Sequence, residues 1–576
     1  MTIESRSYSS FKLAVYCTAG CLDKPLSEIA SDVDFLQRHL RLSKVYIENH
    51  RGDVSLSRDR LNELKAFFEA RGIETAGGIT PTLGEAYRPG YERLFGGICY
   101  TDEASRTKFR EAVANAAAVF DEVIFDDFFF TNCGCDDCLA RKGERSWEEF
   151  RLELMTEVSE QLIMKTAREV NPKARMIIKY PNWNEAYPAS GYNTETQPKL
   201  FDGVYTGTET RDPAISQQHI PRYASYSLLR WMDNLAPGRN GGGWFDSLDC
   251  TYADYYLEQA YLTAFGKAKE MTLFCYSLLR DSYYVPALGF QLDKLDMLAG
   301  QLGDPVGATV YLPHRAKGED HLYDYLGMLG IPFELTPNFP ETPEAPLLIT
   351  AGAAADEGIV GKMKRFLAQG GQIVMTSGFV ERMTGRGAED FTTLRPTGKR
   401  LSVQQFAQHT HSCTFDDFTL SAEPLVYPVF DYSTNGTWQQ IVALKGHNNI
   451  PVLMYDNYGK GKIHTLIVPD HAPDLWKLPE PVVTQLRGLF ARRLALPYEL
   501  AGPANAGLFA YDNGTFALEN FAPQPQKWRL RLPAGGSVSG LTGAAHAEHL
   551  STDAKDGSAL YEIRLAPSTY AGFRVE

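Results

Sequence analysis

The sequence predicts an α/β protein in three parts: a (β/α)8 TIM barrel, a smaller doubly wound α/β domain, and a C-terminal antiparallel β-domain. Three observations support this fold class. Short apolar segments alternate with longer amphipathic ones from Phe11 to Gly303, the alternation breaks at Pro305, and helical patterns stop after Pro503. A chain of 576 residues also exceeds the roughly 250 to 300 residues at which single cores stop growing. We expect domain boundaries at 1–303, 304–502 and 503–576.

Eight short segments rich in β-branched and aromatic residues are the expected barrel strands. They span residues 12–17, 44–48, 73–80, 123–127, 176–180, 204–207, 243–246 and 271–276. Helical patterns lie between them or follow the last one, at 61–71, 105–120, 147–170, 252–267 and 290–302. Eight such units match a (β/α)8 barrel, in which functional groups lie at the C-terminal ends of the strands.

The rest of the chain predicts two smaller domains. Strands are expected at 308–312, 345–352 and 372–376, with a helix at 361–368. Neither a G-x-G-x-x-G turn after a strand nor a P-loop is present, so the sequence does not support a nucleotide site. Alternating segments at 507–511, 515–520 and 528–532 predict the final antiparallel sheet.

Composition and charge exclude several classes of protein. The hydrophobic share of 44% and the charged share of 22% are ordinary for a globular protein. A net charge of -14 argues against a nucleic-acid partner, which would call for a basic face. The sequence has no signal peptide pattern and no apolar run that could span a bilayer. We therefore expect a cytoplasmic protein with no membrane or nucleic-acid partner.

Two adjacent carboxylates follow the fourth expected strand. Asp126 and Asp127 lie at its C-terminal end, where a barrel presents its catalytic groups. Neighbouring strand residues point in opposite directions, so only one of the two is expected to point into the mouth. The alternative is structural: one Asp caps the following turn and the other binds a backbone amide.

Three cysteines follow within a few residues. Cys133, Cys135 and Cys138 have the spacing of a loop that wraps a tetrahedral metal ion. Cys99, in the loop after the third strand, is the expected fourth ligand because neighbouring barrel strands bring their loops together. Four thiolates predict a structural zinc site. The alternatives are reduced cysteines without a metal, or a disulfide formed during handling.

These motifs resemble the zinc-binding barrel of the glycoside hydrolase family 42 β-galactosidases. The likeness rests on Cys99 before a polar helix start, a strand that ends in an adjacent polar pair, and the C-x-C-x-x-C run. GGQIVMTSG and VLMYDNYGKGKIHTLIVP are similar to the trimerisation domain of that family, and the C-terminal seventy or so residues to its small β-domain. The resemblance implies a divergent relative that hydrolyses glycosidic bonds as a homotrimer.

The resemblance also implies catalytic roles. The family's fourth strand ends in Asn-Glu, which places Asp127 at the acid/base position and Asp126 at the position of a substrate-binding residue. Asp246, at the end of the seventh strand, takes the position of the nucleophile. Both catalytic positions carry Asp rather than Glu, so the chain departs from the β-galactosidases themselves. The resemblance favours retention of the anomeric configuration, and no cofactor is expected for catalysis.

Glu209, after the sixth strand, is a rival carboxylate. It could replace Asp246 as the catalytic partner, bind sugar hydroxyls, or form a salt bridge with Arg211. Residues expected to contact an oligosaccharide or small glycoside are Glu48, Asn182, Trp183, Trp244 and Tyr276, with Trp231 as a further aromatic. For any one of the aromatic residues, packing in the core is an equal alternative.

Two other functions remain open. A polysaccharide lyase would need a cation to neutralise a uronate and a Tyr or His base, and the acidic mouth argues against it. A sugar-binding or assembly protein with an inactive barrel is the third hypothesis, because both expected Glu positions have changed.

Overall fold

The computed structural model describes residues 7–83, 93–409, 415–446, 448–543 and 545–576. The chain divides into two compact units, residues 1–300 and 301–576. No helix in the described ranges is both long enough and apolar enough to cross a membrane.

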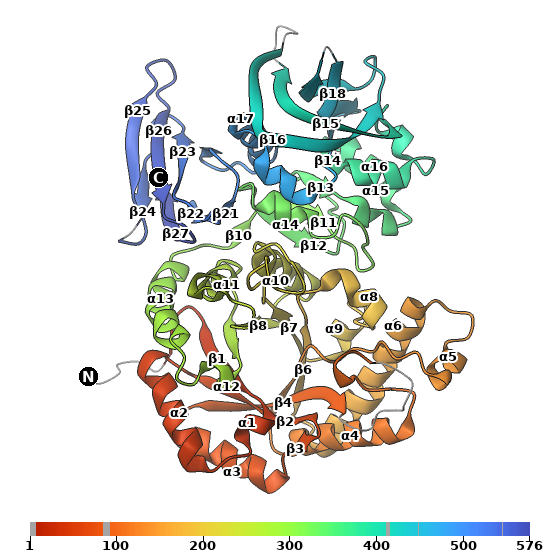
Figure 1. Cartoon of the computed structure of the whole chain (residues 1–576), viewed down its shortest axis with the longest axis vertical. Helices are drawn as coiled ribbons and strands as arrows, with labels where there is room; N and C mark the ends of the chain where they lie inside the picture. Colours follow the sequence, from red (N-terminus) through yellow and green to blue (C-terminus); the bar gives the residue numbers. More distant parts are fainter. Residues whose placement is uncertain (1–6, 84–92, 410–414, 447, 544) are drawn as a thin grey trace. The chain divides into compact units, whose positions relative to one another are not determined.

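The first unit is a closed barrel of eight parallel strands (Figure 1). They are β1 (Lys12–Cys17), β2 (Lys44–Gly52), β4 (Glu74–Leu83), β5 (Glu122–Phe125), β6 (Arg175–Tyr180), β7 (Gly203–Gly207), β8 (Asn240–Asp246) and β9 (Glu270–Phe274). Pairing of β1 with both β9 and β2 closes the ring. The short β3 (Val54–Ser55) pairs antiparallel with the end of β2. All eight expected strands, and the barrel that they predict, are confirmed.

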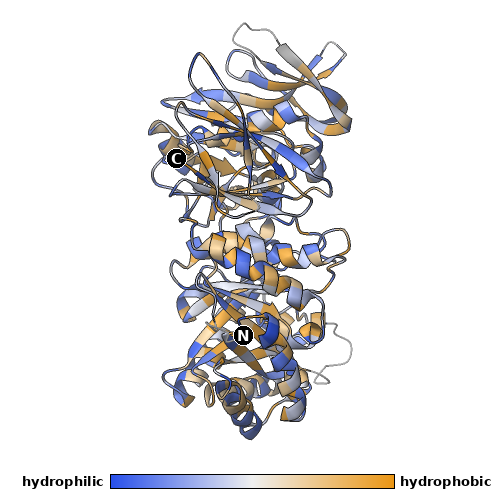
Figure 2. Cartoon of the chain, turned by 90° about the vertical axis from the view of Figure 1, so that its left-hand side faces the viewer, coloured by the Kyte–Doolittle hydropathy of each residue, from blue (hydrophilic) through white to orange (hydrophobic). Residues whose placement is uncertain are grey.

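Helices surround the barrel. The longer ones are α2 (Leu26–His39), α3 (Arg58–Glu69), α4 (Glu103–Ala117), α6 (Trp147–Val158), α10 (Ala224–Leu235), α11 (Ala253–Phe265) and α13 (Tyr284–Ala299). Local sequence explains where several begin: the Asp102 side chain accepts the Ser105 N–H at the start of α4, and Ser146 and Glu149 form a capping box on α6. In Figure 2 the helices carry both hydrophilic and hydrophobic residues, as amphipathic helices on a barrel require.

The barrel interior is filled by a layer of large side chains. Five of the barrel strands each contribute one residue to this layer: Tyr46, Ile124, Ile177, Tyr205 and Trp244. Two positions further along the same strands come Glu48, Asp126, Lys179, Gly207 and Asp246. Because side chains alternate along a strand, these later positions also face inward, at the C-terminal end of the barrel. An apolar floor therefore lies beneath a polar mouth.

The second unit begins with a mixed nine-stranded sheet. Its parallel part has the order β12 (Phe333–Thr336), β11 (Ala308–Tyr311), β13 (Leu347–Ile349), β14 (Gln372–Thr376) and β19 (Gly461–Leu466). The sheet continues antiparallel through β18 (Asn448–Tyr458), β17 (Trp438–Lys445), β15 (Arg395–His409) and β16 (Phe415–Asp431). The expected doubly wound domain is present. Sequence analysis missed the antiparallel extension, whose long strands break the alternation of apolar and polar residues with bulges.

The C-terminal part is a two-sheet β-structure. One sheet has the order β10 (Pro305–Val306), β21 (Ala506–Tyr511), β22 (Thr515–Asn520), β27 (Tyr570–Val575) and β24 (Val538–Gly540). The other has β20 (Glu499–Ala501), β23 (Gln526–Leu532), β26 (Ala559–Leu565) and β25 (Ala547–Thr552). A shared apolar core that includes Phe516, Trp528 and Phe573 joins them. The predicted antiparallel β-domain is confirmed, whereas the exact domain boundaries stay a prediction.

Candidate active site

Lys179 lies at the centre of the polar mouth. Its ammonium nitrogen is 2.6 Å from Glu209 Oε1 and 3.1 Å from Asp127 Oδ2, and 3.9 Å from Asp126 Oδ1. The nitrogen also lies 4.6 Å from the centre of the Trp244 ring. Burial acts to lower the pKa of Lys179, but the three carboxylates outweigh burial and raise it. The side chain is 1% exposed and is held there as a permanent cation.

Asp126 is the inward-facing member of the carboxylate pair. Its Oδ2 accepts a hydrogen bond from Arg51 at 2.6 Å, and its Oδ1 accepts the Asp127 N–H at 2.7 Å. Burial acts to raise the pKa of Asp126, yet the charges of Arg51 and Lys179 more than offset burial and lower it. Asp126 is thus a fixed anion, and its side chain also accepts the backbone N–H of the next residue.

Asp127 is more exposed than Asp126, and its pKa is raised where that of Asp126 is lowered. Its side chain is 25% exposed, and Lys179 is the only cation among the described residues that its carboxylate contacts. Burial raises its pKa most; Lys179 opposes this, and the negative charges of Asp126 and Glu209 add to it, so the pKa rises to about 8. Asp127 can therefore hold a proton at neutral pH.

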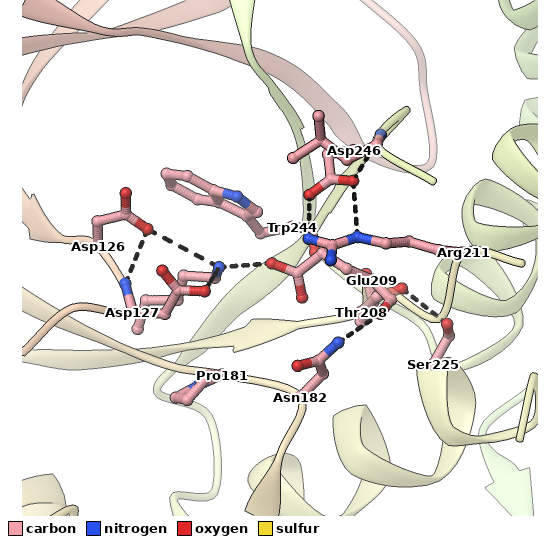
Figure 3. A network of polar contacts seen from close by, with 12 residues as sticks. Asp126, Asp127, Pro181, Asn182, Thr208, Glu209, Arg211, Ser225, Trp244 and Asp246 are labelled. Carbon is pink, nitrogen blue, oxygen red and sulfur yellow. Dashed lines mark hydrogen bonds and ion pairs between the residues drawn. The ribbon is translucent and has the colours of Figure 1, made fainter. Parts of the chain in front are cut away.

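Glu209 points into the same mouth from the loop after β7. It is 3% exposed, and one oxygen binds Lys179 while Oε2 has no hydrogen-bond partner among the described residues. The loop is fixed by the Asn182 amide, which donates to the Glu209 backbone carbonyl, and by Ser225, which donates to the carbonyl of Thr208 (Figure 3). A buried carboxylate oxygen without a protein partner is costly, which makes Glu209 a candidate for a functional role.

Gly207 makes room for this carboxylate. A Cβ at this position would lie 2.5 Å from Glu209 Oε2 and 3.0 Å from the backbone nitrogen of Asn182. Real Cβ atoms do not approach that closely. A side chain at this position would thus displace the Glu209 carboxylate and crowd the backbone of Asn182.

Asp246 forms an ion pair with a different cation. Arg211 binds it with two hydrogen bonds, from Nε to Oδ1 at 2.9 Å and from Nη2 to Oδ2 at 2.7 Å (Figure 3). Burial raises the pKa of Asp246, with Arg211 opposing the rise. The suggested salt bridge between Arg211 and Glu209 is wrong: Arg211 has φ near 55°, and from this left-handed backbone it reaches Asp246.

Glu48 is a fully buried anchor. It accepts hydrogen bonds from the Tyr16 hydroxyl at 2.8 Å and from the Ala19 N–H at 2.7 Å. It also binds Arg51 at 3.0 Å, and burial raises its pKa. Since Arg51 in turn binds Asp126, Glu48 orients the guanidinium that keeps Asp126 ionised. A direct contact of Glu48 with substrate stays a prediction.

The predicted aromatic contacts are packed to different extents. Trp244 is 1% exposed and packs on Tyr16, with ring centres 4.6 Å apart. Trp231 is also buried, and the Tyr276 hydroxyl donates to Asp32 at 2.6 Å. Trp183 is half-buried and therefore keeps the most accessible ring of the set. The substrate-binding roles of Asn182, Trp183, Trp244 and Tyr276 stay predictions.

The four predicted metal ligands come together. The sulfur atoms of Cys99, Cys133, Cys135 and Cys138 all lie within 4.8 Å of one another, and all four residues are buried. Cys99 Sγ is 3.7 Å from Cys135 Sγ and 3.8 Å from Cys138 Sγ. Sulfur ligands about 2.3 Å from a tetrahedral ion would be separated by about 3.8 Å. The donor set could hold a metal ion.

Sequence analysis missed Arg51 and Lys179 of this site. It named Arg211, but as a partner of Glu209 rather than of Asp246. Lys179 could have been found, because it lies two positions after Ile177 in the strand RMIIKY and therefore shares its inward face. Arg51 follows a bulge after Glu48 that breaks this alternation. The partner of Arg211 depends on a loop conformation that no sequence pattern signals.

Three family models match the chain. Residues 2–287 match "Probable glycosyl hydrolase, catalytic domain", and residues 497–575 match "Probable glycosyl hydrolase, C-terminal domain". Residues 303–471 match the second domain of the uncharacterized protein SSO3021. That protein, from Saccharolobus solfataricus, is 26% identical over 505 residues, which cover 81% of this chain and 83% of the relative.

Solved glycosidases share the fold over nearly the whole chain. An α-L-fucosidase isoenzyme 2 from Paenibacillus thiaminolyticus has a TM-score of 0.66 at 9% identity, with 98% of this chain and 99% of the other covered. Gan42B, a GH42 β-galactosidase from G. stearothermophilus, has a TM-score of 0.64 at 12% identity, with 99% of each chain covered. The fold is thus that of the GH42 enzymes, and the resemblance stated from the sequence is confirmed.

Proposed function

We propose that this chain, a divergent GH42-like protein with a glycosyl hydrolase-like catalytic domain, is a glycoside hydrolase that uses Asp127 and Glu209 on an oligosaccharide or small glycoside. The observation that carries the proposal is the single ammonium of Lys179 bound to both carboxylates, at 3.1 Å and 2.6 Å. The ammonium lies closer to Glu209. Asp127, whose pKa is raised to about 8, is left to hold a proton.

Asp127 takes the role of general acid. A glycosidic oxygen must be protonated as its bond to the anomeric carbon breaks, and an acid with a pKa near the working pH does this best. The pKa of about 8 provides that acid. Its partial exposure gives access to the leaving group.

Glu209 takes the role of the second carboxylate in place of Asp246. Both oxygens of Asp246 accept charge-assisted hydrogen bonds from Arg211, which makes either oxygen a weaker nucleophile. Glu209 Oε2 has no partner among the described residues, so its use as a nucleophile would break no such bond. Asp246 then acts through Arg211, whose loop also carries Glu209.

The separation of the two carboxylates supports a retaining mechanism. Since Asp127 and Glu209 bind the same nitrogen, their nearer oxygens can be no further apart than the sum of the two distances. That limit resembles the roughly 5 to 5.5 Å of retaining glycosidases and is smaller than the roughly 6.5 to 9.5 Å of inverting ones.

The proposed reaction has two steps. Glu209 forms a bond to the anomeric carbon while the glycosidic bond breaks and Asp127 gives its proton to the leaving oxygen. This neutralises Glu209 and removes one of the charges that raise the pKa of Asp127. Asp127 then takes a proton from water, which attacks the anomeric carbon and releases Glu209 with the configuration retained.

We also propose that the four-cysteine cluster binds zinc. Tetrahedral sulfur coordination is typical of structural zinc, which here would join the loop of Cys99 to the loop after β5, next to Asp127. The role is structural because four protein ligands leave no position for water. Homotrimer formation and a cytoplasmic location stay predictions that rest on the resemblance and on the sequence, respectively.

The experiment is hydrolysis of α- and β-linked nitrophenyl glycosides, followed by NMR of the first-formed anomer. The panel includes α-L-fucoside and β-galactoside, after the names of the structural relatives. Turnover with retention supports the proposed pair. Inversion would contradict Glu209 as nucleophile. Binding of sugars without turnover on any substrate would favour the inactive barrel instead.

A further inference from the structure

A cavity of about 840 Å³ lies in the second unit, apart from the residues assigned to catalysis. One wall is built by β18 and β19, whose register pairs Tyr455 with His464 and Asn457 with Lys462. Because these residues alternate along both strands, all four face the same side of the sheet. Residues of α17 (Glu480–Ala491) and just after it, of β14 and β17, and of the turn between β18 and β19 also line the cavity. Regular elements therefore hold the cavity walls in place.

The charged residues that line the cavity are all basic. They are Lys460, Lys462, Arg492 and Arg493, and no carboxylate is among the lining residues. In the part of the chain that the structure describes, none of these four side chains takes part in a salt bridge. The chain as a whole carries a net charge of -14. Four cations without acidic partners among the described residues thus line one cavity of a protein that is negatively charged as a whole.

Neutral polar groups supplement the cations. Amides of Gln439, Gln440 and Gln485 reach the lining, and Gln485 Oε1 is buried without a partner in the described structure. His464 lies beside Gln440, 3.1 Å from its amide oxygen. Burial and the positive charges of Lys462 and Arg493 lower the pKa of His464 to about 3. Four cations with no carboxylate among the lining residues give the cavity a positive potential.

We propose that this cavity binds a small phosphorylated molecule. Phosphate suits the lining because guanidinium groups bind its oxygens in pairs and lysine adds a point charge. The volume admits more than one phosphate group or a phosphate with a small organic part. The site contacts the phosphate through side chains, which agrees with the absence of a nucleotide-binding loop from the sequence.

Isothermal titration of the full chain at constant ionic strength tests the proposal. Inorganic phosphate, pyrophosphate, glucose 6-phosphate and glucose are the probes. Pyrophosphate is expected to bind saturably, one per chain, and glucose not to bind. Tighter binding of glucose 6-phosphate than of inorganic phosphate would identify a sugar phosphate as the preferred form.

Matched variants locate the binding. The double variant Lys462→Gln and Arg493→Gln should weaken pyrophosphate binding at least ten-fold, whereas Lys462→Arg should keep it. The control double variant Arg58→Gln and Lys173→Gln removes two exposed charges from the barrel unit and should bind as the wild type does. No saturable binding by the wild type, unchanged binding in the site variant, or an equal loss in the control would each overturn the proposal.

Discussion

Lys179 and Glu209 form an ion pair of 2.6 Å in the barrel mouth, with side chains only 1% and 3% exposed. Two buried charges are expensive to remove from water unless they are paired closely and bonded further. Here the same ammonium also contacts Asp127 and Asp126. One positive charge thereby contacts three carboxylates; it helps to lower the pKa of Asp126 and opposes the rise in that of Asp127, and the proposed chemistry depends on it.

Substitution of Lys179 by Met should affect both stability and the pH profile. It leaves buried carboxylates without their partner, which costs about 3 to 5 kcal/mol in comparable buried pairs. Since Lys179 lowers the pKa of Asp127, its loss should move the alkaline limb of kcat/KM to a pH above 8. Thermal unfolding and a pH–rate profile measure the two effects. Lys179→Arg, which keeps the charge, serves as the control; an unshifted limb in Lys179→Met would contradict the role.

Activity should fall as pH rises through about 8, because Asp127 must carry a proton to act as an acid. The same pKa affects stability. The native state binds more protons than the unfolded state between the ordinary Asp pKa of about 3.9 and about 8, so the contribution of Asp127 to stability falls across this window. The unfolding free energy of the wild type minus that of Asp127→Asn should therefore decrease from pH 4 to pH 8. A flat difference would show that the pKa is not raised.

Gly207→Ala should reduce activity because it displaces Glu209, although it removes no reacting group. The added Cβ would meet Glu209 Oε2 at 2.5 Å and force the carboxylate away from its place. We expect kcat to fall at least ten-fold, since misplacement of a reacting group by about 1 Å can cost a hundred-fold. Gly20→Ala, at a glycine with open space around its missing Cβ and without a positive φ, is a control for activity. Wild-type activity in Gly207→Ala would show that Glu209 is not held where the reaction needs it.

The cysteine cluster should contain about one zinc ion per chain by elemental analysis. Cys135→Ser should lower that content and the unfolding temperature together, because a structural metal contributes its binding free energy to folding. Cys21→Ser, outside the cluster, should change neither. Full metal content in Cys135→Ser would mean that the ion is bound elsewhere.

The sequence allowed the barrel and the cysteine cluster to be predicted because both depend on local patterns. Strand alternation marks β1 to β9, and the spacing of Cys133, Cys135 and Cys138 reflects the geometry of one loop. The same alternation carries Asp126 and Lys179 to the mouth. Lys179 could have been identified from the same alternation, because it lies two residues after Ile177, which belongs to the inner layer of the barrel.

The pairing of charges could not be predicted in the same way. Asp246 and Glu209 are both acidic residues that follow neighbouring strands, and nothing in the sequence says which of them Arg211 neutralises. The left-handed backbone of Arg211 and the amide contact of Asn182 decide it, and both arise only from loop packing. The long β15 and β16 were missed for a related reason, since bulges shift the alternation along them.

Azide rescue tests the central claim most directly. Glu209→Gly removes the proposed nucleophile, and azide added to this variant should restore turnover of a nitrophenyl glycoside and give a glycosyl azide of inverted configuration. Asp246→Gly should give no such product. A glycosyl azide of inverted configuration from Asp246→Gly, with none from Glu209→Gly, would contradict the account and return the nucleophile to the seventh strand of the barrel.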